Sequence, residues 1–239
     1  EVDIARGGSF LAYSINEAGS SRLVIPHLRK RVAPLSPELP KGVISHLKIA
    51  DNGEVGFSFS SARMPGDVLS VNPDTLAVTR WTESETGGVD TSTFAEPELI
   101  TIRSFDGLEI SGFLYRPDAR KFPGKRPMIM HIHGGPESQI RPEFQGNYNY
   151  LINEMGIAMF FPNVRGSEGY GKTFLTLDNG FKREDSVKDI GAFLDALAKD
   201  PQLDKNRFGI TGRSYGGYMT LAALTHYSDR VRAGIEVVG

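Results

Sequence analysis

The feature that most constrains this chain is a glycine-rich corner between a strand-like run and a helix-like run, within residues 207–220 (RFGITGRSYGGYMT). Residues 212–216 of this corner read G-x-S-x-G, with Ser214 at the centre. The pattern is typical of a tight strand–turn–helix in which glycines make room for the turn and the serine hydroxyl projects above a sheet. A helix that begins just behind the serine points backbone N–H groups at developing negative charge. The corner therefore predicts that Ser214 is a nucleophile rather than a chance serine in a turn.

Strand-like and helix-like segments alternate through the second half of the chain. A hairpin is expected first, because Asp106-Gly107 separates two β-prone runs. Apolar runs and helical spacing then predict strands at 128–133, 157–164, 208–211 and from 233, and helices at 144–155, 185–200 and from 218. Gly156 is the expected cap of the first helix. This alternation indicates an α/β fold with a mostly parallel sheet covered on both faces.

Two backbone N–H groups are the expected donors to the negatively charged oxygen that forms when a serine attacks a carbonyl. One belongs to Tyr215, the residue after Ser214. The other belongs to Gly135, in the HGGP motif at residues 133–136, which follows an expected strand. Because glycine lacks a Cβ, a substrate carbonyl can approach this backbone closely. A plain strand-ending turn is the alternative interpretation of the motif.

The histidines supply no clear base for Ser214. His226 follows the serine on the expected helix, whose geometry carries it away from the corner. His131 and His133 lie two residues apart and therefore on one face of a strand. A buried structural pair is favoured over a metal-binding pair, because no carboxylate lies at ligand spacing. In hydrolases with this corner the acid and the histidine follow the serine, and only 25 residues follow Ser214. We therefore expect no complete triad within this chain.

The first ninety residues read as short β-strands separated by glycine turns. Residues 10–14 (FLAYS) align with residues 54–58 (EVGFS), which gives a period of 44 residues. A period of 40–45 residues fits one four-stranded propeller blade per repeat, and an ordinary β-sandwich fits this spacing equally well. Two blades cannot close a propeller. Residues 86–97 are rich in Thr, Ser, Gly and Glu and predict a linker.

Composition excludes several classes of site and partner. The 27 basic residues nearly balance the 29 acidic ones, so charge gives no argument for nucleic acid or an anionic membrane. The absence of cysteine excludes disulfides, a thiol nucleophile and thiolate metal sites. No apolar run reaches membrane-spanning length. We expect no cofactor and no metal, and composition leaves the compartment and the oligomeric state open. Glu1 at the start and Gly239 directly after a strand-like run suggest that both ends are cut.

Three motifs, in this order, resemble the prolyl oligopeptidase family of serine peptidases. They are HGGP at 133–136, NVRGSEGYG at 163–171 and GRSYGGYM at 212–219. The similarity is strongest to the acylaminoacyl-peptidase and dipeptidyl-peptidase-like branches, from about residue 98 onward. It implies an α/β-hydrolase catalytic domain over residues 98–239, incomplete at its C-terminal end, and it favours β-propeller blades over residues 1–90.

The resemblance also implies roles for individual residues. Ser214 resembles the family's nucleophile, and Tyr215 and Gly135 resemble its oxyanion donors. Residues 165–171 resemble a structural loop near the site. The family's Asp and His would lie beyond Gly239, and the paired glutamates with which dipeptidyl peptidases hold a substrate's amino terminus are not visible.

The function expected from these patterns is a serine-type peptidase that hydrolyses short peptides through an acyl-enzyme on Ser214. A carboxylesterase or lipase on the same fold is the first alternative, because this chemistry attacks esters as readily as amides. The HGGP motif, where such esterases often carry HGGG, and the blade-like repeat argue against it. A non-catalytic binding protein on this scaffold is the second alternative. Residues 1–239 alone are expected to be catalytically inert.

Overall fold

The computed structural model describes residues 1–239, which divide into two compact units. The first unit contains Glu1–Phe94 together with Arg141–Gly146, and the second contains Ala95–Ile140 and Asn147–Gly239. The chain therefore leaves the second unit for six residues and returns to it. A short 3₁₀ helix, Thr91–Thr93, precedes the point where the chain first passes to the second unit.

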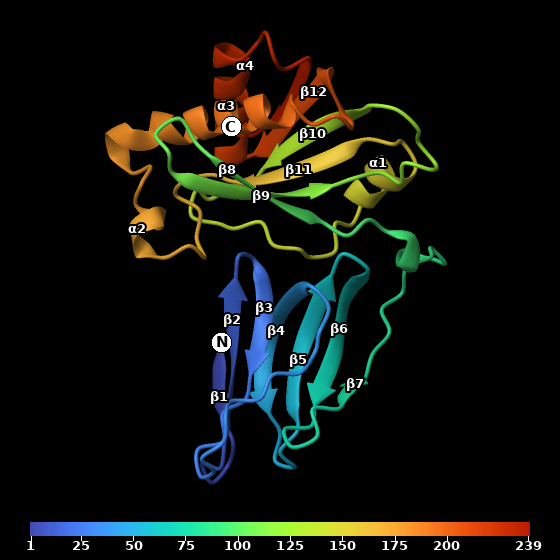
Figure 1. Ribbon diagram of the computed structural model, residues 1–239, viewed down its shortest axis with the longest axis vertical. Coiled ribbons are helices and arrows are strands. Elements are labelled where there is room, and N and C mark those ends of the chain that lie inside the picture. The colour runs from blue at the N-terminus through green and yellow to red at the C-terminus, as the bar shows by residue number, and fades with distance from the viewer. The chain divides into compact units, whose positions relative to one another are not determined.

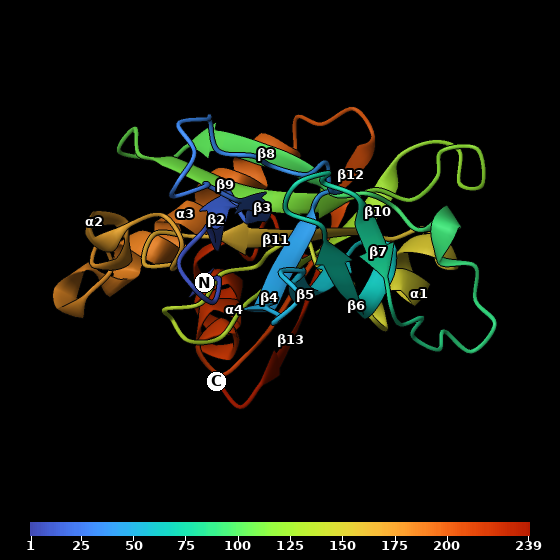
Figure 2. The same cartoon turned by 90° about the horizontal axis from the view of Figure 1, so that it is seen from below.

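The first unit is built of two antiparallel sheets that adjoin through β3 and β4 (Figures 1 and 2). One sheet has the order β1-β2-β3 and the other the order β4-β5-β6-β7. The strands are β1 (Val2–Ile4), β2 (Leu11–Glu17), β3 (Ser20–Val24), β4 (Gly42–Ile49), β5 (Val55–Ser61), β6 (Met64–Val71) and β7 (Val78–Arg80). Alternate residues of β5 are buried, and they join side chains from both sheets in one apolar core.

The second copy of the 44-residue repeat falls on this four-stranded sheet. The aligned residues 54–58 lie at the start of β5, whereas residues 10–14 lie at the start of β2 in the three-stranded sheet. Each copy continues into a hairpin with the next strand, β6 and β3 respectively. Each blade of a β-propeller is one four-stranded antiparallel sheet. The propeller itself stays a prediction.

The second unit contains a mixed six-stranded sheet with the order β13-β12-β10-β11-β9-β8. Its strands are β8 (Glu98–Arg103), β9 (Glu109–Tyr115), β10 (Arg126–Ile132), β11 (Ala158–Asn163), β12 (Leu203–Arg213) and β13 (Ala233–Val237). The four strands from β10 to β13 run parallel, and the β8–β9 hairpin is added antiparallel at one edge. This is the mostly parallel sheet that the alternation of segments predicts.

Helices cover both faces of this sheet. They are α1 (Tyr148–Asn153), α2 (Lys172–Leu175), α3 (Arg183–Leu197) and α4 (Tyr215–His226), with a 3₁₀ turn at Gly180–Lys182. Phe160 of β11 contacts Phe193 of α3, while its neighbour Phe161 contacts Tyr148 of α1. Consecutive strand residues point to opposite faces, so α1 and α3 lie on different sides. α3 and α4 pack against each other (Figure 1). No helix has the length and apolar character needed to cross a membrane.

The expected helix at 144–155 is wrong at its start. Helix α1 begins only at Tyr148, and Phe144 instead stacks on Phe94 at a ring distance of 5.7 Å. Arg141 fixes the same segment by donating to the backbone carbonyl of Gly19 at 2.7 Å. These contacts hold Arg141–Gly146 in the first unit, so helical spacing alone misplaced the helix start. The helix from 218 also begins earlier than expected, at Tyr215.

Candidate active site

Ser214 occupies a sharp turn between a strand and a helix. Strand β12 ends at Arg213 and helix α4 begins at Tyr215, which leaves Ser214 as the single residue between them. Its backbone has φ 57° and ψ −124°, a conformation that residues with a side chain rarely adopt. Such a conformation costs about 1–3 kcal/mol and typically occurs at functional sites. The Ser214 residue is exposed, while its N–H donates to the carbonyl of Val237 at 2.9 Å.

Two glycines make this turn sterically possible. A Cβ added to Gly212 would lie 2.3 Å from the carbonyl oxygen of Gly216, and one added to Gly216 would lie 2.1 Å from that of Ile132. Both distances are far below any real carbon–oxygen contact. Only glycine therefore fits at the two glycine positions of the G-x-S-x-G pattern, and Gly216 brings the corner against the end of β10.

The HGGP motif lies beside the serine because β10 and β12 are parallel neighbours, with Ile132 paired to Gly212. Carboxyl ends of parallel strands meet at one edge of a sheet. A Cβ added to Gly134 would lie 3.6 Å from the Cβ of Ser214. The structure thus brings together Ser214, Tyr215 and the glycine turn that contains Gly135, all of which the sequence singled out.

Tyr215 is the first residue of α4, so its N–H lies in the helical turn whose N–H groups lack intrahelical acceptors four residues back. The positive end of the helix dipole is directed at the same place. Gly135 is exposed, two residues beyond the buried His133. These positions are those expected of two donors to an oxyanion on either side of Ser214.

The side chain of His133 contacts both the glycine turn and the loop that contains Ser167. Its Nδ1 lies 2.7 Å from the carbonyl oxygen of Gly134, and its Nε2 lies 3.0 Å from Oγ of Ser167. A carbonyl oxygen can only accept, so Nδ1 carries the proton and Nε2 accepts from the Ser167 hydroxyl. Burial lowers the pKa of His133, which favours this neutral form. In a trans peptide the Gly134 carbonyl and the Gly135 N–H point in opposite directions. His133 therefore fixes the direction of the Gly135 N–H.

The loop that carries Ser167 is held by a buried ion-pair network. Arg165 is buried and donates to both carboxylate oxygens of Asp189 at 2.9 Å and to those of Asp106 at 2.8 and 3.0 Å. Hydrogen bonds from Arg165 lower the pKa of Asp106 to about 2. Ser104 Oγ donates to Asp189 at 2.5 Å. The loop is therefore anchored both to helix α3 and to the β8–β9 turn.

The other two histidines of this unit, His131 and His226, contact groups other than Ser214. His131 Nδ1 lies 3.0 Å from the hydroxyl of Tyr148, so the two histidines of the HIH motif have separate partners. His226 is the last residue of α4, about 18 Å along the helix from Ser214 at 1.5 Å per residue. Its Nε2 lies 3.9 Å from the Glu184 carboxylate. No group of three or more His, Asp or Glu side chains is arranged to hold a metal ion.

Sequence reasoning missed the supporting polar residues. The role of His133 in orienting a donor depends on Ser167, 34 residues away in the chain. Asp178 and Asp189 are fully buried, yet both lie in polar stretches that resemble solvated surface. The one signal was the resemblance of residues 165–171 to a structural loop near the site, which assigned no role to any of its side chains.

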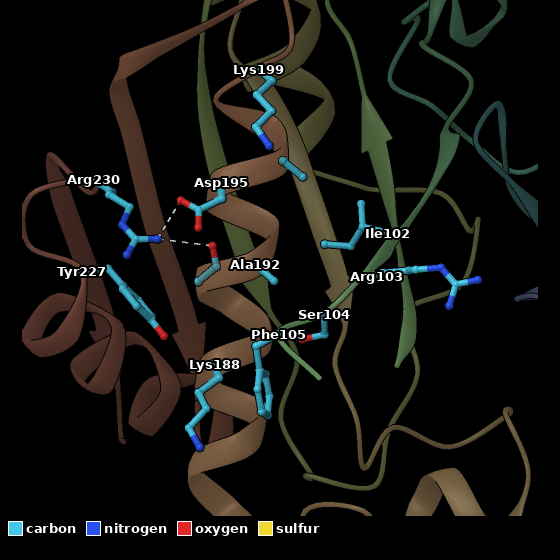
Figure 3. A pocket seen from close by; sticks show the side chains of 12 residues that line it. Ile102, Arg103, Ser104, Phe105, Lys188, Ala192, Asp195, Lys199, Tyr227 and Arg230 are labelled. Atoms are coloured by element: carbon cyan, nitrogen blue, oxygen red, sulfur yellow. Dashed lines mark hydrogen bonds and ion pairs between the residues drawn. The ribbon is translucent and has the colours of Figure 1, made fainter. Parts of the chain in front are cut away.

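A pocket of about 440 Å³ elsewhere in this unit does not belong to the site (Figure 3). The end of β8, one face of α3 and the residues after α4 line it. At one side of it, Arg230 donates to Asp195 of α3 at 2.8 Å and to the carbonyl of Gly191 at 3.4 Å. No residue of the G-x-S-x-G corner or the HGGP turn lines this pocket.

Comparisons with known proteins find similarity to peptidases. The chain is 37% identical over 131 residues to the uncharacterized peptidase YuxL of Bacillus subtilis, covering 54% of this chain and 20% of that protein. It is 26% identical over 180 residues to dipeptidyl-peptidase 5 of Porphyromonas gingivalis, covering 75% of this chain and 26% of that protein. The chain thus spans about a fifth to a quarter of these relatives.

Solved structures match the fold over almost the whole chain. The acylaminoacyl peptidase of Pyrococcus horikoshii matches with a TM-score of 0.76 and 26% identity, covering 99% of this chain and 37% of that one. A puromycin hydrolase matches with a TM-score of 0.84 and 22% identity, covering 98% of this chain and 35% of that one. Residues 142–239 match the profile of the prolyl oligopeptidase family. These residues, which include the Ser214 corner, are thus similar to the prolyl oligopeptidase family.

Proposed function

We propose that this chain carries the nucleophile and the oxyanion donors of a serine-type peptidase that hydrolyses short peptides through an acyl-enzyme on Ser214. The observation that carries the proposal is the backbone of Ser214, strained at φ 57° and ψ −124° between β12 and α4. This conformation aims the serine away from the sheet while the helix start and the glycine turn lie beside it. The match of residues 142–239 to the prolyl oligopeptidase family supports peptidase chemistry over other uses of the fold.

The chemistry assigns a role to each residue of the corner. Ser214 Oγ forms a bond to the carbonyl carbon of the substrate, and the N–H groups of Tyr215 and Gly135 donate to the oxygen that becomes negative. Collapse of this intermediate breaks the peptide C–N bond and leaves the acyl group on Ser214. The serine proton must pass to a base and then to the leaving amine. In this fold that base follows the serine, and His226 is too far along α4 to serve.

The proposed preference for short peptides rests on the first unit. Its four-stranded antiparallel sheet, β4 to β7, is the kind of sheet from which propeller blades are made. A propeller beside a hydrolase domain would restrict entry of folded proteins. In the full-length protein that carries this sequence, we expect rapid cleavage of short peptides and little cleavage of folded proteins.

A fluorophosphonate probe tests the central assignment. The full-length protein is labelled, digested and mapped, with Ser214→Ala as the matched variant. We expect one adduct, on Ser214, which disappears in the variant together with peptidase turnover. Labelling of another serine, or equal labelling of the variant, would refute the assignment. Turnover of a p-nitrophenyl ester is then compared with turnover of a short peptide. The esterase alternative predicts that the ester is hydrolysed many orders of magnitude faster than the peptide.

A further inference from the structure

A buried polar cluster lies directly beneath Tyr215. The Tyr215 hydroxyl lies 2.8 Å from Oγ of Ser186 and donates to Oδ2 of Asp178 at 3.3 Å. Arg183 forms an ion pair with the same carboxylate, and its guanidinium lies 5.1 Å from the centre of the Tyr215 ring. Burial raises the pKa of Tyr215 to about 12, so the hydroxyl remains a donor at neutral pH. The side chain of Tyr215 is therefore fixed at both its ring and its hydroxyl.

The other oxygen of Asp178 faces the loop that supports the glycine turn. Asp178 is fully buried, and its Oδ1 has no hydrogen-bond partner. A Cβ added to Gly166 would lie 2.2 Å from this Oδ1, so the loop backbone passes directly against the carboxylate. The next residue, Ser167, bonds to Nε2 of His133. The Asp178 carboxylate is therefore connected to the Gly134–Gly135 peptide through the loop, Ser167 and His133.

Asp178 thus contacts the supports of both proposed oxyanion donors. One oxygen meets the side chain of Tyr215, and the other meets the loop that holds His133 in place. From this arrangement we infer that Asp178 is a positioning residue that keeps the N–H groups of Tyr215 and Gly135 aimed at one point. The inference rests on the proposed function, because it assigns a role in aligning those two donors.

The cost of Asp178 to folding supports a role beyond stability. A buried carboxylate with one unsatisfied oxygen destabilises a protein, even when a partner such as Arg183 offsets part of its charge. Proteins depart from such packing rules mainly at functional sites. Oxyanion donors act only when they lie about 2.7–3.1 Å from the developing charge. A displacement of about 1 Å can lower the rate about 10²-fold, so a rigid support behind both donors has a direct effect on the reaction.

The test uses two conservative variants and a matched control in the full-length protein. Tyr215→Phe removes the hydroxyl but keeps the backbone N–H, and Asp178→Asn keeps the shape but removes the charge. Tyr227→Phe is the control, because the Tyr227 hydroxyl also joins the α4 region to α3, donating to the Val187 carbonyl at 3.2 Å at the end remote from Ser214. Each variant is compared for kcat and KM on a short peptide, for inhibition by a peptide aldehyde, and for melting temperature.

We expect Tyr215→Phe and Asp178→Asn to lower kcat about 10- to 100-fold with KM nearly unchanged. The inhibition constant of the aldehyde, which forms an oxyanion on the enzyme, should rise by a similar factor. Tyr227→Phe should change neither constant, and Asp178→Asn should melt at the same or a higher temperature. If Asp178→Asn does not fold, Tyr215→Phe decides the question.

Two negative results are distinguishable. Wild-type turnover that depends on Ser214, with unchanged kcat in both variants, overturns the role of Asp178 and leaves the proposed function intact. An equal loss of kcat in Tyr227→Phe also overturns it, because general loosening of α4 would then explain the effect. Absence of Ser214-dependent turnover in the wild type refutes the proposed function and, with it, this inference.

Discussion

At the scale of single residues, the corner at Ser214 is defined by the space that its neighbours leave. The strained backbone of Ser214 persists because β12 on one side and α4 on the other are fixed by packing in the core, through Ile210 and Met219 among others. Gly212 and Gly216 contribute by their missing side chains. The corner therefore has a steric requirement that can be tested apart from any chemistry.

Gly216→Ala should destabilise the fold, because its Cβ would lie 2.1 Å from the Ile132 carbonyl oxygen. We expect a loss of about 1–3 kcal/mol in the free energy of unfolding, measured by urea denaturation. Gly209→Ala, on the same region of sheet, is the control, because its Cβ would lie 3.5 Å from the nearest atom. Its effect should stay within about 0.5 kcal/mol. Equal losses in the two variants would contradict the steric argument.

The two histidines of the HIH motif should differ sharply in their effect on the reaction. His133→Phe keeps a ring but loses both bonds, to the Gly134 carbonyl and to Ser167. The Gly135 N–H is then no longer held, and we expect kcat of the full-length protein to fall about 10²-fold. His131→Phe keeps its ring contact with Phe161 and should leave kcat nearly unchanged. Similar kcat values for the two variants would show that His133 orients no donor.

At the scale of secondary-structure elements, the sequence predicted the strands and helices whose positions depend on local apolar spacing. The strand expected at 128–133 is β10 at Arg126–Ile132, and the apolar spacing of 185–200 corresponds to α3 at Arg183–Leu197. The start of α1 could not be predicted this way, because the contacts of Phe144 with Phe94 and of Arg141 with Gly19 connect distant parts of the chain. Periodicity carries no information about such pairs.

The same distinction holds for the candidate site. The proposed nucleophile and the two proposed donor positions follow from short motifs whose glycines and spacing are local. Asp178 and Ser167 could not be predicted, because their importance comes from lying behind Tyr215 and His133 in space. A buried aspartate in a stretch such as LDNGF has no local signal that separates it from a surface aspartate.

The carboxyl end of β10 should make stability depend on pH. Burial lowers the pKa of His131 and of His133, the latter despite its bond to the Gly134 carbonyl. The unfolded chain binds protons at these histidines near pH 6.5, and the folded chain binds them only at lower pH. The free energy of unfolding is therefore fully retained above about pH 6.5 and falls as the pH decreases below it.

Urea denaturation between about pH 8 and pH 5 measures this dependence. The His131→Phe, His133→Phe double variant is the comparison, because it removes both titrating groups while keeping both rings. Its free energy of unfolding should fall less steeply below pH 6.5 than that of the wild type. Identical slopes would mean that the two histidines do not stay neutral in the folded state.

At the scale of the whole molecule, the two units differ in how far sequence reasoning reached. The sheet of the second unit follows from alternating strands and helices, and its strand order could not be read from spacing. The first unit is made of short antiparallel strands whose grouping into three and four was not predicted, because a 44-residue repeat does not say which strands pair. The brief return of Arg141–Gly146 to the first unit likewise depends on contacts between distant residues.

A polypeptide of residues 1–239 should be catalytically inert and prone to aggregate. Ser214 needs a base, and His226, the histidine that follows it in this chain, lies at the far end of α4.

Strand β13 is at the edge of the six-stranded sheet. Ile235 on this strand is 68% exposed, and Val238 directly after it is 70% exposed. An exposed apolar edge strand is a template for pairing with other chains, which a charge placed on it opposes. Ile235→Lys should therefore raise the soluble, monomeric fraction in size-exclusion chromatography, without restoring turnover of a chromogenic peptide. A soluble wild-type monomer with Ser214-dependent turnover of roughly 1 s⁻¹, the low end of ordinary enzyme rates, would prove this prediction wrong.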